Sequence, residues 1–273
     1  MAWTERQRAM LAEMGIAVWG PAAEAARADL PASLPPTASV PSLQPAPAAL
    51  PAAPAADRMA SAPGRVALPS QARLDAPALR AAVLGCTACP LGLGRRQAVY
   101  GGGHPQAHWM VVGDAPDEAD DASGEPFSGA PGRLLDNMLR ALGLDRGVDG
   151  DPARRAYLVH AVKCRPPADR YPEPAEVARC EPYLRRQIEL VQPRILLAMG
   201  RYAVLSLLHS SEPMGRLRGR AHDCMGVPLV VTYAPAYLLR HPEEKARAWD
   251  DLCLAWQTLQ ALPAAATSVP ASS

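Results

Sequence analysis

Four of the six cysteines have a spacing that would suit metal ligands. Cys86 and Cys89 form the close pair "CTAC", Cys164 lies in "KCRPP", and Cys180 lies in "ARCEPY". One close pair with two distant partners supplies four thiolates, which suits either a zinc ion or a [4Fe–4S] cluster. Zinc sites in small modules usually have two close pairs, which this sequence lacks. The spacing therefore predicts a metal site but does not choose the metal.

The two other cysteines, Cys224 and Cys253, stand alone and are expected to be small buried hydrophobes. No segment has the apolar run of a signal peptide or the length of a membrane span. We therefore expect a cytoplasmic protein with no membrane contact, in which structural disulfides are disfavoured. The net charge of +1 argues neither for nor against nucleic acid, because binding needs only a local basic patch.

The elements that must position the reactive residues are visible as four apolar runs. They cover residues 109–113, 156–162, 194–200 and 227–233. Helical patterns with one apolar face alternate with them, at 132–144, 173–191, 201–208 and 241–262. Such alternation predicts an α/β fold with a mostly parallel, four-stranded central sheet covered on both faces. Ligands in these folds bind beyond the carboxyl ends of the strands, where "GDAPDEADD", "KCRPP", "GRYA" and "APAYLLRHP" lie.

The composition confines this fold to the second part of the chain. Residues 21–77 are mostly alanine, proline and serine, so they predict a disordered linker that cannot bury enough apolar surface to fold. Residues 1–20 have a short helical pattern, which we interpret as a docking element for a partner protein. The folded domain is expected at 79–262, followed by a disordered tail at 263–273.

Taken in order, these motifs resemble the family 4 uracil-DNA glycosylases over about 79–262. The resemblance rests on "CTAC", "GDAPDEADDASGEPFSGAPGRLLDNML", "KCRPP" with its later cysteine, and "TYAPAYLLRHP". It implies a three-layer α/β/α fold and an enzyme that removes uracil from DNA during base-excision repair. It also implies a structural [4Fe–4S] cluster bound by Cys86, Cys89, Cys164 and Cys180. We expect a monomer whose partner is single- or double-stranded DNA containing uracil.

The resemblance also implies roles for individual residues around the base. Phe127, the only phenylalanine of the chain, matches the residue that stacks on the extruded uracil. Gly113 and Ala115 belong to the turn that faces the base, and Asp120 matches an acidic position near its C5 atom. The neighbouring Glu118 and Asp121 are expected to be solvated.

Three departures from the family pattern affect this pocket. Asp114 stands where the family has a glutamate that orients water or balances the sugar cation, and its reach is shorter by about 1.5 Å. Asp117 replaces a glycine and places a side chain near the ligand. His160 replaces an asparagine that offers a donor and an acceptor to uracil, whereas a neutral imidazole nitrogen is only one of these. We expect His160 to act in catalysis as a relocated donor.

The fourth departure is Ala234, which stands where the family has a histidine that donates to uracil O2. Losing one preorganised donor typically costs a factor of about 10²–10³ in rate. His241, seven residues further on, is expected to be a loop or helix-start residue and not a substitute donor.

The remainder of this loop is expected to contact DNA. The matching residues are Tyr237, Leu238, Leu239 and Arg240, which suit entry into the duplex and contact with phosphate. Arg216 and Arg218, in "MGRLRGRAH", add a basic edge, with Arg201 and Lys163 beside it. The sequence thus predicts a uracil-DNA glycosylase weakened at Ala234, His160 and Asp114. The alternatives are a cluster-containing DNA-binding protein with little or no excision, or a glycosylase for another deaminated base.

Overall fold

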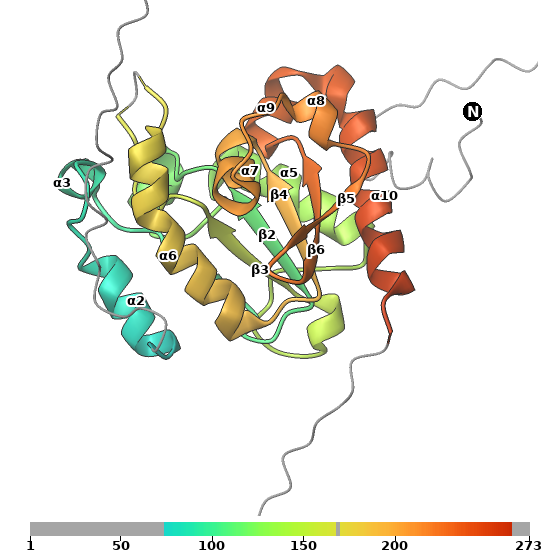
Figure 1. Cartoon of the computed structure of the whole chain (residues 1–273), viewed down its shortest axis with the longest axis horizontal. Coiled ribbons are helices and arrows are strands. Elements are labelled where there is room, and N and C mark those ends of the chain that lie inside the picture. The colour runs from blue at the N-terminus through green and yellow to red at the C-terminus, as the bar shows by residue number, and fades with distance from the viewer. Residues whose placement is uncertain (1–73, 168–169, 264–273) are drawn as a thin grey trace, which may run out of the picture. The chain divides into compact units, whose positions relative to one another are not determined.

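The computed structural model of the chain describes residues 74–167 and 170–263 (Figure 1). The predicted docking element 1–20, almost all of the predicted linker 21–77 and almost all of the predicted tail 263–273 lie outside these residues. Within the described part, no helix has the length and apolar character needed to cross a membrane.

The centre of the domain is a parallel sheet made by the four predicted apolar runs. Its parallel strands are β2 (Trp109–Gly113), β3 (Ala156–His160), β4 (Ile195–Met199) and β6 (Val227–Thr232). Two short strands, β1 (Gly102–Gly103) and β5 (Ala221–Cys224), pair antiparallel at the edges. The order is β1-β3-β2-β4-β6-β5, so the sheet has six strands and not the predicted four. The edge strands escaped prediction because "GG" and "AHDC" contain no apolar run.

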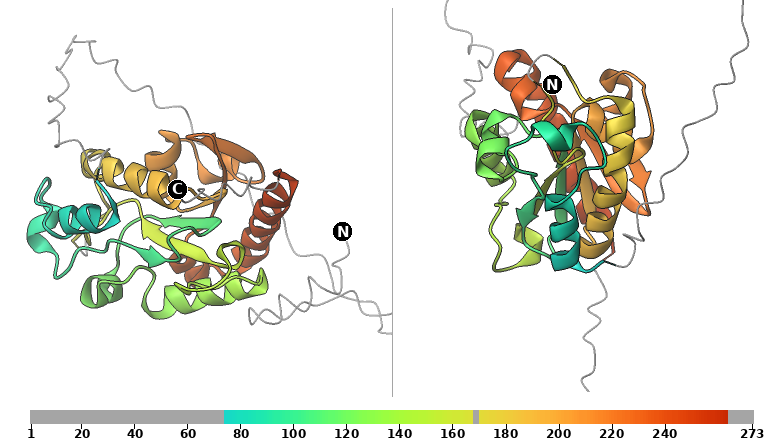
Figure 2. Two further views of the ribbon diagram at one scale, coloured as in Figure 1. Left: turned by 90° about the horizontal axis from the view of Figure 1, so that it is seen from below. Right: turned by 90° about the vertical axis from the view of Figure 1, so that its left-hand side faces the viewer.

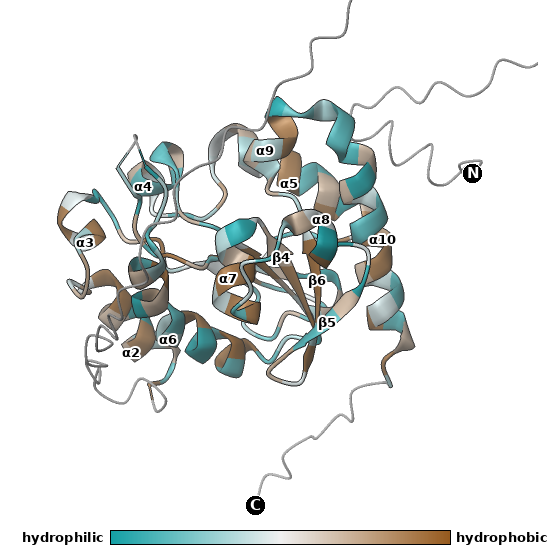
Figure 3. Ribbon diagram, turned by 45° about the horizontal axis from the view of Figure 1, so that its top comes forward, coloured by the Kyte–Doolittle hydropathy of each residue, from teal (hydrophilic) through white to brown (hydrophobic). Residues whose placement is uncertain are grey.

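Helices cover both faces of the sheet, which confirms the three-layer α/β/α prediction (Figure 2). One face carries α6 (Pro174–Val191) and α7 (Arg201–Leu208), and the other carries α5 (Gly129–Ala141) and α10 (Lys245–Ala261). The central strands β4 and β6 are mostly hydrophobic, as strands covered on both sides require (Figure 3). In β2, Met110 packs in the core beneath α6 and α7, whereas Trp109 stacks on Trp256 of α10 with ring centroids 6.3 Å apart.

Five short helices complete the described part. They are α2 (Ala76–Leu84), α3 (Leu91–Gly94), α4 (Glu118–Ser123), α8 (Met214–Leu217) and α9 (Pro235–Arg240). Helix α2 begins inside the segment predicted as linker, because Asp75 caps it by accepting a hydrogen bond from the Ala78 amide at 2.9 Å. Leu79 and Val83 of α2 are fully buried, so this helix belongs to the domain.

The register of the strands brings their carboxyl ends level. Gly113 pairs with His160 on one side and with Met199 on the other, and Met199 pairs with Thr232. The residues that directly follow these positions therefore emerge along one edge of the sheet, where parallel α/β folds bind their ligands.

An inward-facing ion pair holds α10 against the segment before β5. Arg218 Nε donates to Asp251 Oδ2 at 2.7 Å, and the two side chains are 11% and 2% exposed. The Arg218 guanidinium also lies 4.2 Å from the ring centroid of Tyr233. Arg218 was predicted to contact DNA, but its guanidinium group is bound within the domain by Asp251 and Tyr233.

We expect Arg218→Met to lower the free energy of unfolding by about 3 kcal/mol, because it leaves the buried Asp251 carboxylate unpaired. Chemical denaturation monitored by circular dichroism measures this change. The control is Arg216→Met, since Arg216 is exposed on α8. Equal stability of the two variants would contradict the assignment.

Candidate active site

Gly113, Phe127 and His160 meet at the carboxyl edge of the sheet. The ring centroids of Phe127 and His160 are 4.5 Å apart, and the rings are tilted by 39°. A Cβ atom on Gly113 would lie 2.5 Å from Phe127 Cζ and 2.6 Å from His160 Nδ1. Glycine is therefore required at this point, because any side chain would displace one of the two rings. The structure brings together three residues that the sequence predicted for the base pocket.

The backbone around Phe127 is built to hold its ring inward. Phe127 has a φ of 54°, a left-handed conformation that costs energy for a residue other than glycine. Its carbonyl oxygen accepts from the Arg146 guanidinium at 3.4 Å, and Arg146 is paired with Asp136 at 2.7 Å. A Cβ atom on Gly132 would overlap that carbonyl. The phenyl ring, 6% exposed, is thus positioned by its loop and by the start of α5.

His160 and Asp120 form a buried pair beneath Phe127. His160 Nε2 lies 2.8 Å from Asp120 Oδ2, and the two side chains are 4% and 3% exposed. Burial alone would raise the pKa of Asp120, but the hydrogen bond from His160 and those from two backbone amides outweigh it and lower the pKa. Asp120 is therefore a carboxylate, and it orients the imidazole.

Two other acidic residues of this loop have structural roles. Asp117 caps α4, its carboxylate accepting from the amides of Ala119 at 2.8 Å and Asp120 at 3.0 Å. Its side chain thus serves the helix start. Asp121 is buried and accepts from the Arg96 amide at 2.9 Å, so its predicted solvation is wrong. The sequence hid this role because the amides that bind it lie far away along the chain.

Asp114, the first residue after β2, is held by the start of α7. Its Oδ1 atom accepts from the amides of Tyr202 at 2.7 Å and Ala203 at 2.9 Å. Burial raises the pKa of Asp114 to about 6, although these amides and His160 act in the opposite direction. Asp114 and Ala115 are half-buried as residues, although the Asp114 carboxyl group itself is buried. This group therefore changes charge near neutral pH.

In the last loop, Ala234 follows β6 after one intervening residue, Tyr233. Ala234 precedes α9 and provides no side-chain cap for it. Leu238 is fully buried and fixes α9 in the domain, whereas Leu239 is 42% exposed and Arg240 is also exposed. Tyr237 is half-buried and stacks on His241 with ring centroids 4.3 Å apart. Of the predicted DNA-contacting residues here, Leu239 and Arg240 are thus displayed, and Leu238 is not.

Lys163, expected in the basic patch, is buried instead. Its Nζ atom donates to the His160 carbonyl at 2.6 Å and to Gln187 Oε1 at 2.7 Å. Burial lowers its pKa to about 7. Lys163 therefore links the end of β3 to α6 and does not reach solvent.

The four predicted metal-binding cysteines lie in one region beside β3. Cys89, Cys164 and Cys180 share a buried cluster with Val162 and Val177. Cys86 is partly exposed, and all four thiols are free of disulfides. Arg95 Nη1 lies 2.9 Å from Cys164 Sγ. Burial raises the pKa of Cys164, and that of Cys180 to about 12.

In residues 74–167 and 170–263, no three His, Cys, Asp or Glu side chains form a set that could hold a metal ion. The four thiols are nevertheless close enough that Cys86 and Cys89 affect the pKa of Cys164. An iron–sulfur cluster takes its thiolates on different irons, so its ligands stand farther apart than those of one ion. Four cysteine thiols in one region are a donor set that an iron–sulfur cluster can take.

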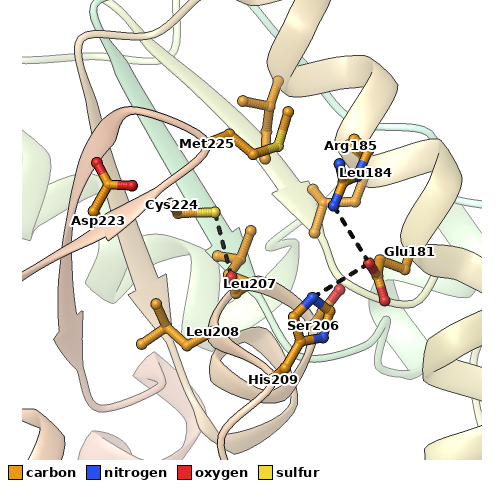
Figure 4. Close-up of a pocket in the computed structure, with 11 residues that line it drawn as sticks. Glu181, Leu184, Arg185, Ser206, Leu207, Leu208, His209, Asp223, Cys224 and Met225 are labelled. Atoms are coloured by element: carbon orange, nitrogen blue, oxygen red, sulfur yellow. Dashed lines mark hydrogen bonds and ion pairs between the residues drawn. The ribbon is translucent and has the colours of Figure 1, made fainter. Parts of the chain in front are cut away.

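A separate cavity of about 300 Å³ is lined by α6, α7 and the β5–β6 turn, with Glu181, Ser206 and Cys224 among its residues (Figure 4). None of the residues that line it was predicted to bind the base, DNA or a metal.

Two tyrosines that the sequence reasoning missed lie beside Asp114. Tyr171 is 70% exposed and stacks on Tyr202 with ring centroids 5.9 Å apart. Arg170 holds this segment through two hydrogen bonds to the buried Glu176, at 2.8 and 2.7 Å. The signal available in the sequence was an aromatic residue within the polar stretch "ADRYPEP".

Fold and site together define a three-layer α/β protein with an aromatic ring, an imidazole and carboxylates gathered at the carboxyl edge of its sheet. Residues 100–256 match the family model of the uracil DNA glycosylase superfamily. A type-4 uracil-DNA glycosylase of Pyrobaculum aerophilum is 34% identical over 189 residues, which cover 66% of this chain and 93% of that protein. Its counterpart in Thermotoga maritima is 37% identical over 164 residues, 59% of this chain and 82% of the relative. The chain belongs to the uracil-DNA glycosylase superfamily, in the type-4 family that its sequence resembles.

We expect Gly113→Ala to lower the free energy of unfolding by about 1–3 kcal/mol, because its methyl group would overlap Phe127 and His160. Thermal and chemical unfolding measure the effect. The control is Gly215→Ala in α8, where nothing lies within 4 Å of the added atom, and its stability should change by less than about 1 kcal/mol. A tolerated Gly113→Ala would contradict the close packing of the two rings.

Proposed function

We propose that this protein hydrolyses the bond between uracil and deoxyribose in DNA, as the first step of base-excision repair. The single observation that carries the proposal is the meeting of Phe127, His160 and Asp114 at the carboxyl edge of the sheet, in a chain of this family. A ring that stacks, a polar edge-reader and a carboxylate are the parts needed to hold an extruded base and cleave it from its sugar.

Phe127 is the proposed stacking surface for the base. A glycosylase must remove its base from the DNA stack, and an aromatic face replaces the contacts that the base loses. The left-handed backbone at Phe127 and the hydrogen bonds from Arg146 to its carbonyl oxygen fix the main chain that carries the ring before DNA arrives. Only the ring itself then has to adjust to the base.

Asp114 is the proposed catalytic carboxylate. It would accept a proton from the water whose oxygen bonds to C1′, while the electron pair of the broken bond leaves with N1 of uracil. Its pKa of about 6 means that it is mostly ionised above neutral pH and fails in acid. The folded state binds this proton more tightly than the unfolded chain does. The resulting stabilisation is complete below the ordinary Asp pKa of 3.8 and is lost as pH rises through about 6.

Ala234 explains why we propose a slow enzyme. The departing uracil gathers negative charge on O2, and a hydrogen-bond donor aimed there lowers the barrier. Ala234 has no donor at the start of α9, and His241 is turned toward Tyr237 and Glu243. His160 is bound to Asp120 on the pocket side away from this loop. The chain therefore retains the binding parts of the site but lacks one stabilising donor.

The DNA strand is proposed to cross the exposed residues around this edge. Leu239, Arg240 and Arg216 provide an apolar wedge and two cations. Tyr171, stacked on Tyr202 next to Asp114, offers a face for a neighbouring base. Arg218 and Leu238, which face inward, are assigned to the scaffold.

We further propose that Cys86, Cys89, Cys164 and Cys180 bind a [4Fe–4S] cluster. The bound cluster would supply a structural crosslink between the segment after α2, the end of β3 and α6, without chemistry on the base. Iron binding would remove the cost of ionising buried thiols, and Arg95 and Lys163 lie nearby to balance the negative charge.

We expect the purified protein to produce abasic sites in a uracil-containing single strand, detected by alkaline cleavage. Ala234→His should raise the single-turnover rate about 10²–10³-fold, by restoring a donor for O2. The control is Ala236→His, which places the same side chain at an exposed position of α9. No abasic product from either the parent or Ala234→His, at enzyme excess, would refute the proposed activity.

We expect Cys164→Ser to abolish the visible absorbance and most of the bound iron, because it removes one of four thiolates. Iron analysis and absorbance spectroscopy of protein purified without oxygen measure both. Cys224→Ser is the matched control, since Cys224 is also a buried free thiol but lies in the separate cavity. The proposed cluster would be contradicted if the parent protein bound no iron, or if Cys164→Ser bound as much iron as the parent protein.

A further inference from the structure

The buried pair of His160 and Asp120 determines which ring nitrogen of His160 carries a proton. Asp120 Oδ1 accepts from the Ser128 amide at 2.6 Å, and Oδ2 faces His160 Nε2 at 2.8 Å. Asp120 is ionised and has no proton to donate. Nε2 must therefore be the donor. Nδ1 has no acceptor within reach, so a proton there would be a buried donor without a partner, and this geometry favours Nδ1 as a bare acceptor.

The bare nitrogen lies next to Gly113 and the Phe127 ring at the carboxyl edge of the sheet. His160 Nδ1 is buried without any hydrogen-bond partner among the described residues. Its nearest surroundings are Gly113 and the edge of the Phe127 ring. A buried acceptor without a donor is unfavourable, so a ligand N–H at this point would gain a bond that the free protein lacks. The Phe127 ring edge must move aside to admit it.

We propose that His160 Nδ1 selects bases with a ring N–H at the position of uracil N3, and that Asp120 sets this preference by fixing the tautomer. The class comprises deaminated bases, because deamination converts a bare ring nitrogen beside an amino group into an N–H beside a carbonyl. Cytosine presents a lone pair at that position and is rejected. The neighbouring carbonyl is not read, since one imidazole nitrogen replaces the two groups of an amide. The inference rests on the proposed function and specifies its substrate class.

Because Asp120 sets which nitrogen of His160 carries the proton, replacing Asp120 by asparagine should move that proton to the other nitrogen. Both oxygens of Asp120 face a backbone amide, Oδ1 that of Ser128 at 2.6 Å and Oδ2 that of Asp117 at 3.4 Å. In Asp120→Asn the shorter Ser128 bond favours the amide oxygen at the Oδ1 position. The –NH₂ group then faces His160 Nε2 and donates to it. Nδ1 would consequently carry the proton, and the pocket would prefer the bare nitrogen of cytosine.

The test compares binding of the full-length protein to single strands that differ in one nucleotide. Each strand carries one 2′-fluoroarabino nucleotide, which resists cleavage, with uracil, 3-methyluracil or cytosine as its base. Fluorescence anisotropy gives the dissociation constants. We expect the parent protein to bind uracil about 10–100-fold more tightly than either other base. Uracil N3–H donates to His160 Nδ1, whereas the cytosine lone pair or the 3-methyl group would clash with that nitrogen.

We expect Asp120→Asn to lower the uracil-to-cytosine preference at least tenfold and to favour cytosine. The matched control is Asp121→Asn, an equally buried residue of the same helix that binds backbone amides and does not touch His160. It should keep the preference of the parent. In a His160→Asn background, where the amide offers both donor and acceptor, adding Asp120→Asn should leave the preference for uracil.

An unchanged preference in folded Asp120→Asn, or equal binding of all three bases by the parent, would overturn the inference. If Asp120→Asn does not fold, ¹⁵N NMR of the parent protein shows which nitrogen of His160 carries a proton. The His160 signals are identified by their absence from the spectrum of His160→Asn. A proton on Nε2 supports the inference and a proton on Nδ1 refutes it. Base preference without uracil excision would refute the proposed function alone.

Discussion

The register that aligns the carboxyl ends of the four parallel strands determines where the residues of the candidate site lie. Because Gly113 is paired with both His160 and Met199, a residue after β2 necessarily lies beside the end of β3 and the start of α7. Asp114 exploits this position by accepting two amide hydrogen bonds from α7. A shift of one residue in the register would turn His160 to the other face of the sheet and separate it from Asp120.

Much of the domain could be predicted from the sequence because its determinants are local. The four central strands are continuous apolar runs, and each lies within its predicted range. The convergence of Gly113, Phe127 and His160 was implied by the resemblance to the family and not by a local pattern in the sequence. The edge strands could not be found this way, since their pairing is decided by the neighbouring strand and not by their own composition.

The sequence was least informative about charged and polar side chains, whose roles depend on distant partners. Arg218 is directed inward by Asp251, 33 residues away, and Asp121 by amides 24 and 25 residues away. Leu238 is buried because α9 packs on α5, a contact that no local pattern indicates. An exposed and a buried charge have the same letter in a sequence, and only the tertiary partner distinguishes them.

The position of Lys163 couples the thiol region to the base-binding site. A single side chain connects the backbone of His160, at the pocket, to Gln187 of α6, and the next residue along the chain is Cys164. The pocket and the thiol region therefore share one short, rigid length of polypeptide. Oxidation that displaces Cys164 would be transmitted mechanically to the pocket. Oxidation of the thiol region and loss of base binding would then occur together.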